Sequence, residues 1–228
     1  MQYTLTNNKT NVKIPIFWII CHNWIETEQK KGYYNSRKHE KRYKIMELKL
    51  EKGRPSDTSA RLPKEIKIYD CLDGRGIEYD RVDHPAYDSM EDCEATDELL
   101  GCGTVKNLLL CNSQKTEFYM LLMPADKKFK TKELSKQIGS ARLSFASGEL
   151  MEQLLDITPG SLTVLGLIND SDKKVRLLID RDVCESEYIV AHPCINTTSL
   201  KIKTSDIFGV FLPHLKREPI FVDLIGED

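Results

Sequence analysis

The sequence lacks the features that define several large classes of protein. No apolar run approaches the roughly 18 residues that a bilayer-spanning helix needs, so we expect no membrane-spanning segment. Neither sign of charge dominates, because 33 Lys and Arg residues stand against 35 Asp and Glu residues. The net charge of -2 excludes a histone-like basic binder, although one face can still be basic. Apolar residues at 40% and charged residues at 30% are typical of a globular domain.

Common catalytic and nucleotide-binding motifs are also missing. The chain contains no GxxxxGK(S/T), HExxH or GxSxG, which argues against P-loop, zincin and α/β-hydrolase functions. The pairs Gly74-Arg75-Gly76 and Gly101-Cys102-Gly103 lack the third glycine of a dinucleotide-binding loop. Each pair follows a predicted helix, so we interpret both as helix C-caps.

Cysteine occurs seven times, but never in CxxC spacing. An odd count without paired spacing predicts reduced, mostly buried thiols in a cytoplasmic protein. Cys184, His192 and Cys194 match no standard zinc spacing and lack a fourth ligand, so we expect no metal site. A thiol-redox function is suggested by the number of cysteines alone.

Residues 1–45 differ in composition from the rest of the chain. They hold nine Lys and Arg against three Glu, a net charge of +6, whereas residues 46–228 hold 24 basic and 32 acidic groups. Their charge follows the apolar stretch instead of preceding it, which does not fit a secretory signal. We predict a basic N-terminal extension, disordered or the product of an overcalled start, and one domain over residues 46–228. A tail that binds RNA or a membrane surface is the alternative.

Hydrophobic periodicity and turn residues predict alternating helices and strands after residue 46. Helices are expected to begin at Pro63, Asp88, Thr131, Ser147 and Asp206. Strands are expected over residues 77–82, 105–111, 118–123, 162–168, 175–179, 188–191 and 199–203. Because adjacent strands form hairpins with helices interspersed, this pattern predicts an α+β domain with a mixed β-sheet.

Three polar stretches are not well explained by local structure. Lys106-Asn107 opens an otherwise apolar strand, where a buried lysine needs solvation or an ion-pair partner. Residues 158–163 form a tight turn whose glycine lets backbone N–H groups point at an anion or a carbonyl oxygen. His192 and Asn196 follow the end of a strand with hydrogen-bonding side chains. Taken singly, each stretch fits an ordinary role as well: a surface lysine, a simple turn and a structural histidine.

Together and in this order, these stretches resemble the prolyl-tRNA editing-domain family, the YbaK/ProX-like proteins. The resemblance covers about residues 60–224. It rests on six motifs: Asp83-His84-Pro85, Lys106-Asn107-Leu108, Pro124-Ala125-Asp126, Ile138 to Ala146, Pro159 to Thr163 and His192 to Asn196. The implied fold is that of the prolyl-tRNA synthetase-associated domain: α+β, with a mixed, partly barrel-like β-sheet and surrounding helices. Within the family, the free-standing alanyl-tRNA(Pro) deacylases are the most similar.

The resemblance implies a trans-editing hydrolase that removes alanine from mischarged alanyl-tRNA(Pro) by ester hydrolysis. A proline pocket cannot reject a smaller apolar amino acid by more than a few kcal/mol, so a second, smaller pocket must remove the error. No metal or organic cofactor belongs to this chemistry. Matched to the family motifs, Lys106 is the key lysine, which neutralises a terminal phosphate or polarises the ester carbonyl. The turn residues Gly160, Ser161, Leu162 and Thr163 supply backbone N–H groups to the developing oxyanion.

The same match makes Asn107, His192 and Asn196 substrate-binding residues. Asn107 orients the aminoacyl group or the adenosine, while His192 and Asn196 belong to the pocket wall. The general base stays open, because the terminal hydroxyl of the tRNA can activate water as well as a protein group can. Val164 replaces a proline found in many relatives, which leaves open whether alanine or another small amino acid is removed.

The implied partners are the acceptor end of mischarged tRNA(Pro) and, as a further candidate, prolyl-tRNA synthetase, with no role for DNA or a membrane. A net-negative protein that binds an acceptor stem needs a local basic patch. Residues 124–142 offer one: Lys127, Lys128, Lys130, Lys132, Lys136 and Arg142. A solvated lysine-rich helix has the same composition. The rival functions are a deacylase for another small amino acid, such as cysteinyl-tRNA(Pro), and a non-catalytic tRNA- or synthetase-binding module.

Overall fold

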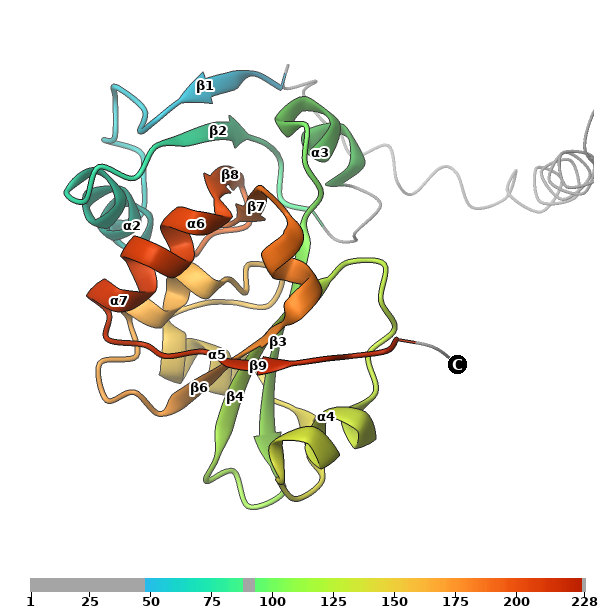
Figure 1. The fold of residues 1–228 in the computed structure, drawn as a ribbon. Coiled ribbons are helices and arrows are strands. Elements are labelled where there is room, and N and C mark those ends of the chain that lie inside the picture. The colour runs from blue at the N-terminus through green and yellow to red at the C-terminus, as the bar shows by residue number, and fades with distance from the viewer. Residues whose placement is uncertain (1–47, 88–92, 227–228) are drawn as a thin grey trace, which may run out of the picture. The chain divides into compact units, whose positions relative to one another are not determined.

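The computed structural model describes residues 48–87 and 93–226. The predictions for residues 1–45 and for the helix start at Asp88 lie outside these ranges. Among the described residues, no helix is both long and apolar enough to cross a membrane. The described strands form two open sheets with helices packed around them (Figure 1), which confirms the α+β class. Neither sheet closes into a barrel, so "partly barrel-like" describes the arrangement only loosely.

The first sheet is antiparallel throughout and has the order β1-β2-β8-β7. Its strands are β1 (Leu50–Lys52), β2 (Tyr79–Asp83), β8 (Thr198–Lys203) and β7 (Tyr188–Ala191). Asp83, at the end of β2, lies opposite Thr198, at the start of β8. This register brings the end of β2 beside the segment that connects β7 to β8.

The second sheet is mixed and has the order β5-β3-β4-β6-β9. Its strands are β5 (Leu143–Phe145), β3 (Val105–Asn112), β4 (Phe118–Pro124), β6 (Val175–Asp180) and β9 (Ile220–Val222). Strands β3 and β4 form the predicted antiparallel hairpin, whereas β4 pairs with β6, and β6 with β9, in parallel. The mixed character expected from the sequence is therefore confined to this sheet.

Local signals account for several helix ends. Helix α2 (Pro63–Asp73) has a proline in its first turn, and α3 (Glu94–Leu100) ends at the left-handed Gly101. Helix α4 (Thr131–Ile138) begins at the predicted residue. In α5 (Gly148–Leu155), the Ser147 side chain accepts a hydrogen bond from the Leu150 N–H, as an N-cap should.

The last helical region is continuous but irregular. It consists of α6 (Thr204–Asp206), the π-helical segment η4 (Ile207–Phe211) and α7 (Leu212–His214). Before β7, the short 3-10 helix η3 (Arg181–Glu185) follows β6 directly. The predicted closing helix is thus present, with a π segment at its centre.

The predicted strand over residues 162–168 is wrong. Residues Val164–Ile168 form the 3-10 helix η2, and the Thr163 side chain caps it by accepting a hydrogen bond from the Leu165 N–H. Most of this helix is buried, because Val164, Leu165 and Leu167 all belong to the main core. A short apolar run buried on all sides gives the same sequence pattern as a central strand.

Two large apolar clusters and a small third one, of Val82, Leu100 and Val190, hold the described domain together. The larger one joins α2, α5 and η2 to one face of β3, β4 and β6 and includes Tyr69, Leu109 and Met120. The smaller one lies under α4 and includes Leu110, Tyr119 and Leu134. Leu109 and Leu110 fall in different clusters because successive residues of a strand face opposite sides of the sheet.

Candidate functional site

A pocket of about 420 Å³ opens where the two sheets meet, and we call it the junction pocket. The sheets approach each other at an isolated parallel bridge between Thr104, just before β3, and Val190 in β7. Both residues line the pocket. So do five of the eight site residues expected from the sequence: Lys106, Asn107, Gly160, Leu162 and His192. The fold therefore brings the three polar stretches together at one cavity.

Lys106 and Asn107 enter the junction pocket from the start of β3. The half-buried Lys106 donates a hydrogen bond from Nζ to the Lys127 carbonyl at 2.8 Å. An ammonium has three donors, so this contact leaves donors for a ligand. The Lys127 carbonyl also holds the Lys106 side chain at the pocket and, being neutral, does not cancel its positive charge.

Asn107 carries an unused acceptor. Its Nδ2 donates to the Val105 carbonyl at 3.2 Å, which fixes the orientation of the amide. Its Oδ1 is buried and has no hydrogen-bond partner within the described part of the chain. A buried acceptor left unpaired costs about 1–3 kcal/mol, so such an atom in a pocket is a natural site for a donor on a ligand.

The turn between α5 and η2 forms a second wall. Gly160 has φ +90°, and a Cβ there would lie 2.9 Å from the Asn196 Nδ2 atom. Ser161 is fully buried, and its N–H and Oγ both donate to the Thr158 carbonyl. Thr163 is also fully buried. Of the four turn residues expected from the sequence, Gly160 and Leu162 thus line the pocket, beside Pro159, whereas Ser161 and Thr163 are buried behind them.

Asn196 lies outside the pocket lining and supports it. Its Nδ2 donates to the Tyr87 carbonyl at 2.8 Å, and its Oδ1 accepts from the Tyr87 N–H at 3.4 Å. The same amide lies against Gly160. Asn196 thus connects the end of the β2 segment to the glycine turn.

His192 is held in one tautomer by the backbone. Its Nδ1 lies 2.8 Å from the Thr198 carbonyl, which can only accept, so Nδ1 carries the proton. Burial lowers the pKa of the imidazole from its usual value of 6.5. The ring is therefore neutral at pH 7, and Nε2 is left as an acceptor for a ligand in the pocket.

A second histidine lies behind the first. The His84 ring centroid is 5.9 Å from that of His192, and His84 stacks on Tyr87 with centroids 4.1 Å apart. Its Nδ1 lies 2.8 Å from the Pro85 carbonyl and its Nε2 lies 3.0 Å from the Ser199 Oγ. Burial lowers the pKa of His84 to about 4, so this ring is also neutral at pH 7.

A partly buried ionic network fixes the carbonyl that holds His192. Arg61 donates to both oxygens of Asp83, at 2.9 and 2.6 Å, and Thr198 Oγ1 donates to Asp83 Oδ1 at 2.8 Å. Burial raises the pKa of Asp83, but the hydrogen bonds from Arg61, Arg81 and Thr198 outweigh it and hold the pKa at about 2. Motif matching included Asp83 and His84 but gave them no role, because their partners come from distant segments.

The expected basic patch is partly engaged in structure. Lys127 forms ion pairs with Asp180, at 2.9 Å, and Asp182, at 2.7 Å, and donates to the Leu224 carbonyl. Lys132 and Lys136 are exposed on α4. These two side chains are better placed than Lys127 to meet phosphates.

Metal and thiol chemistry find little support in the described residues. Within residues 48–87 and 93–226, no group of three or more His, Cys, Asp or Glu is placed to hold a metal ion. Cys184 is exposed on η3, whereas Cys194 is fully buried. Burial raises the pKa of the Cys194 thiol to about 12, which makes it a poor nucleophile.

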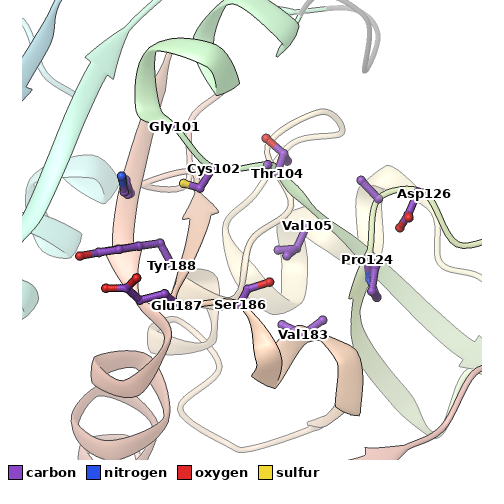
Figure 2. Close-up of a pocket in the computed structure, with 13 residues that line it drawn as sticks. Gly101, Cys102, Thr104, Val105, Pro124, Asp126, Val183, Ser186, Glu187 and Tyr188 are labelled. Carbon is purple, nitrogen blue, oxygen red and sulfur yellow. The ribbon is translucent and has the colours of Figure 1, made fainter.

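A larger pocket of about 610 Å³ lies next to the junction pocket and shares Thr104 and Val105 with it. Figure 2 shows Tyr188 and Glu187 on one side of it and Pro124 and Asp126 on the other. None of the eight expected site residues lines it. The chemistry predicted from the sequence therefore belongs to the smaller cavity.

Taken together, these features define an α+β domain with a small pocket that presents a lysine, a neutral histidine and an unpaired amide oxygen. The sequence profile of the aminoacyl-tRNA editing domain matches residues 84–209, more than half of the chain and a range that includes all eight site residues. The chain belongs to the aminoacyl-tRNA editing domain family. The family resemblance inferred from the motifs is thereby confirmed.

Individual proteins agree with this assignment. The chain is 28% identical over 136 residues to the prolyl-tRNA editing protein ProX of Acetoanaerobium sticklandii, covering 60% of this chain and 83% of that protein. It is 24% identical over 180 residues to prolyl-tRNA synthetase associated domain-containing protein 1 of Danio rerio, covering 78% and 96%. A solved structure of a candidate trans-editing enzyme for prolyl tRNA synthetase has a TM-score of 0.53 at 14% identity, covering 72% and 98%. This last likeness shows a shared fold, and the family supports tRNA editing as the class of activity.

Proposed function

We propose that this chain is a trans-editing hydrolase that removes alanine from mischarged alanyl-tRNA(Pro). The observation that carries the proposal is the junction pocket, where Lys106, Gly160 and His192 surround a small cavity beside the unpaired Oδ1 of Asn107. Its partners are the acceptor end of tRNA(Pro) and prolyl-tRNA synthetase. Family membership and the ProX relative support the reaction class.

The pocket can hold the amino acid by its ammonium group. Asn107 Oδ1 and His192 Nε2 are both acceptors, and an aminoacyl ester carries three N–H donors near neutral pH. Leu108, Met151 and Ala191 line the cavity with apolar surface against which a methyl group packs. The proposal requires that the end of the cavity that holds the amino acid admit alanine and reject proline by size, and cysteine is close enough in size to alanine to compete.

The reaction is an ester hydrolysis by water. Attack forms a bond from the water oxygen to the carbonyl carbon and moves an electron pair onto the carbonyl oxygen. The N–H groups of Gly160 and Leu162 and the Lys106 ammonium stabilise that negative charge. Collapse then breaks the bond to the ribose oxygen, which takes the proton lost by the water, directly or through the neighbouring ribose hydroxyl. The products are alanine and uncharged tRNA.

The decisive experiment compares deacylation of alanyl-, cysteinyl- and prolyl-tRNA(Pro) by the full chain and by Lys106→Ala. We expect rapid loss of alanine, retention of proline, and a fall in kcat/KM of about 100-fold or more in the variant. Lys174→Ala, which removes an exposed lysine that pairs with Asp172, is the matched control and should keep full activity.

Each other outcome assigns a different function. Faster loss of cysteine than of alanine makes the chain a deacylase for another small amino acid. If every amino acid stays attached while the tRNA still binds, the editing proposal fails and a non-catalytic tRNA-binding module replaces it.

A further inference from the structure

One large aromatic side chain at the junction pocket is unusually exposed. Phe145 lines the pocket and is 62% exposed, although most large apolar side chains of the described domain are buried. The residues that line this cavity include two aromatic rings, those of Phe145 and His192. A phenylalanine that is exposed beside a ligand site is a candidate contact surface, because burying it on binding removes apolar area from water.

The backbone holds Phe145 in place before any ligand arrives. It ends the edge strand β5, where it lies opposite Leu110, and the Ala146 N–H donates to the Leu109 carbonyl at 2.8 Å. Strand pairing therefore fixes the backbone of Phe145, while most of its side chain is exposed. A rigid aromatic surface loses little conformational entropy when it binds a flat partner.

A second ring fixes the orientation of the first. Phe129 packs against the smaller core cluster, and its ring meets that of Phe145 edge-on, with centroids 5.9 Å apart and planes at 65°. An edge-on contact uses the rim of a neighbouring ring and leaves a face of Phe145 available for stacking. The pair thus resembles a platform with a half-buried support, Phe129, and an exposed surface, Phe145.

The charge around this platform suits a nucleic acid. Helix α4 contacts β5 and carries the exposed Lys132 and Lys136, with Arg142 exposed just before the strand. Aromatic surfaces next to basic side chains are the usual arrangement for binding single-stranded nucleic acid, where bases stack and phosphates meet cations. An apolar peptide would gain nothing from these cations.

We propose that Phe145 stacks on the terminal nucleobase of the RNA whose ester occupies the junction pocket, and that it contributes binding without taking part in the chemistry. This inference rests on the proposed function, because an aminoacyl ester in the pocket places the terminal ribose, and hence its base, at the pocket mouth. The terminal base of every tRNA is adenine, a purine whose two fused rings offer a larger stacking surface than a pyrimidine does.

The test uses binding, so that it does not depend on turnover. A short single-stranded RNA that ends in cytidine-cytidine-adenosine is titrated against wild-type protein and against Phe145→Trp, Phe145→Leu and Phe145→Ala. The Leu and Ala variants should bind about tenfold more weakly than the wild type, whereas Phe145→Trp should keep wild-type affinity. The reason is that a base stacks on an aromatic ring and not on an aliphatic chain. Phe221→Ala, which removes an exposed ring on β9, is the control and should bind as the wild type does.

A second RNA with an abasic terminal nucleotide isolates the contact. Wild-type protein should lose about tenfold in affinity for it, and Phe145→Ala should lose nothing further. The proposal is overturned if Phe145→Leu binds the intact RNA as tightly as the wild type does. It is also overturned if each variant loses the same affinity for the abasic RNA as for the intact one. Absence of deacylation with these stacking effects intact refutes the proposed function alone.

Discussion

The Nδ1 atom of His192 lies 2.8 Å from the carbonyl oxygen of Thr198, and this contact decides which ring nitrogen faces a ligand. The carbonyl is held because Thr198 also donates from Oγ1 to Asp83, which Arg61 binds through two donors. A backbone acceptor thus does for His192 what a carboxylate does in many hydrolases, without adding negative charge.

The first prediction concerns the pH dependence of substrate binding. Burial lowers the pKa of His192 below 6.5, so Nε2 stays an acceptor until the pH falls beneath that value. Protonation then places a cation beside the ammonium of the amino acid. We expect KM for alanyl-tRNA(Pro) to rise in acid with a midpoint below pH 6.5, measured by initial rates at saturating and limiting substrate. His192→Phe should show weaker binding and no such midpoint. A midpoint above pH 6.5 contradicts the assignment.

The second prediction concerns Gly160. Alanine at this position must adopt φ +90° and displace the Asn196 amide, which would lie 2.9 Å from the new Cβ. We expect Gly160→Ala to lower kcat/KM by about tenfold or more, because the turn that offers its N–H groups must move. Gly139→Ala is the matched control: its φ is +65°, but a Cβ there meets nothing within 4 Å. The control should lose about 1 kcal/mol of stability and no activity.

Prediction from sequence succeeded where the signals are local. The start of α4 and the N-cap at Ser147 follow from residues next to the helix ends that they mark. The β3–β4 hairpin follows from two apolar runs joined by a polar loop. These features need no knowledge of distant segments.

It failed where pairing is non-local. Strands β5 and β9 have three residues each and exist through their pairing with β3 and β6. Neither carries a periodic pattern long enough to detect. The prediction of a strand over residues 162–168, where the structure has η2, failed for a related reason. A segment that is buried on all sides lacks the alternation of apolar and polar residues that distinguishes a strand from a helix.

The site shows the same division. Motif matching found Lys106, Asn107 and His192, whose side chains belong to recognisable stretches. It gave no role to Asp83 or Phe145, although both lie within the matched motifs, and it missed the Thr198 carbonyl completely. A backbone oxygen is present in every residue, so only the folded structure shows which one is used.

The third prediction links His84 to stability in acid. Burial holds its pKa at about 4, whereas the unfolded chain has the ordinary value near 6.5. The unfolded state therefore binds more protons in this window, and stability that is complete above pH 6.5 is lost as the pH falls toward 4. We expect the free energy of unfolding by urea to drop by up to about 3 kcal/mol over this range from His84 alone.

The control is His84→Phe, which keeps a ring against Tyr87 but cannot titrate. Its unfolding free energy should be lower at pH 7, since the Ser199 contact is lost, and should change less between pH 6.5 and 4. Parallel pH curves for the two proteins refute the role of His84. His192 contributes in the same direction, so the variant keeps part of the slope.

The last prediction tests where the phosphates bind. The exposed Lys132 and Lys136 lie on α4, next to the edge strand that carries Phe145, whereas Lys127 is already paired with Asp180 and Asp182. Each phosphate contact releases bound cations, so the affinity for tRNA falls with salt in proportion to the number of contacts. Removing both lysines should weaken binding at low salt and reduce the slope of log affinity against log salt by about two.

Lys173→Ala with Lys174→Ala removes the same charge from the exposed turn before β6 and should leave the slope unchanged. A slope that does not respond to the α4 substitutions places the phosphates elsewhere. A wild-type affinity that does not depend on salt excludes phosphate contacts altogether.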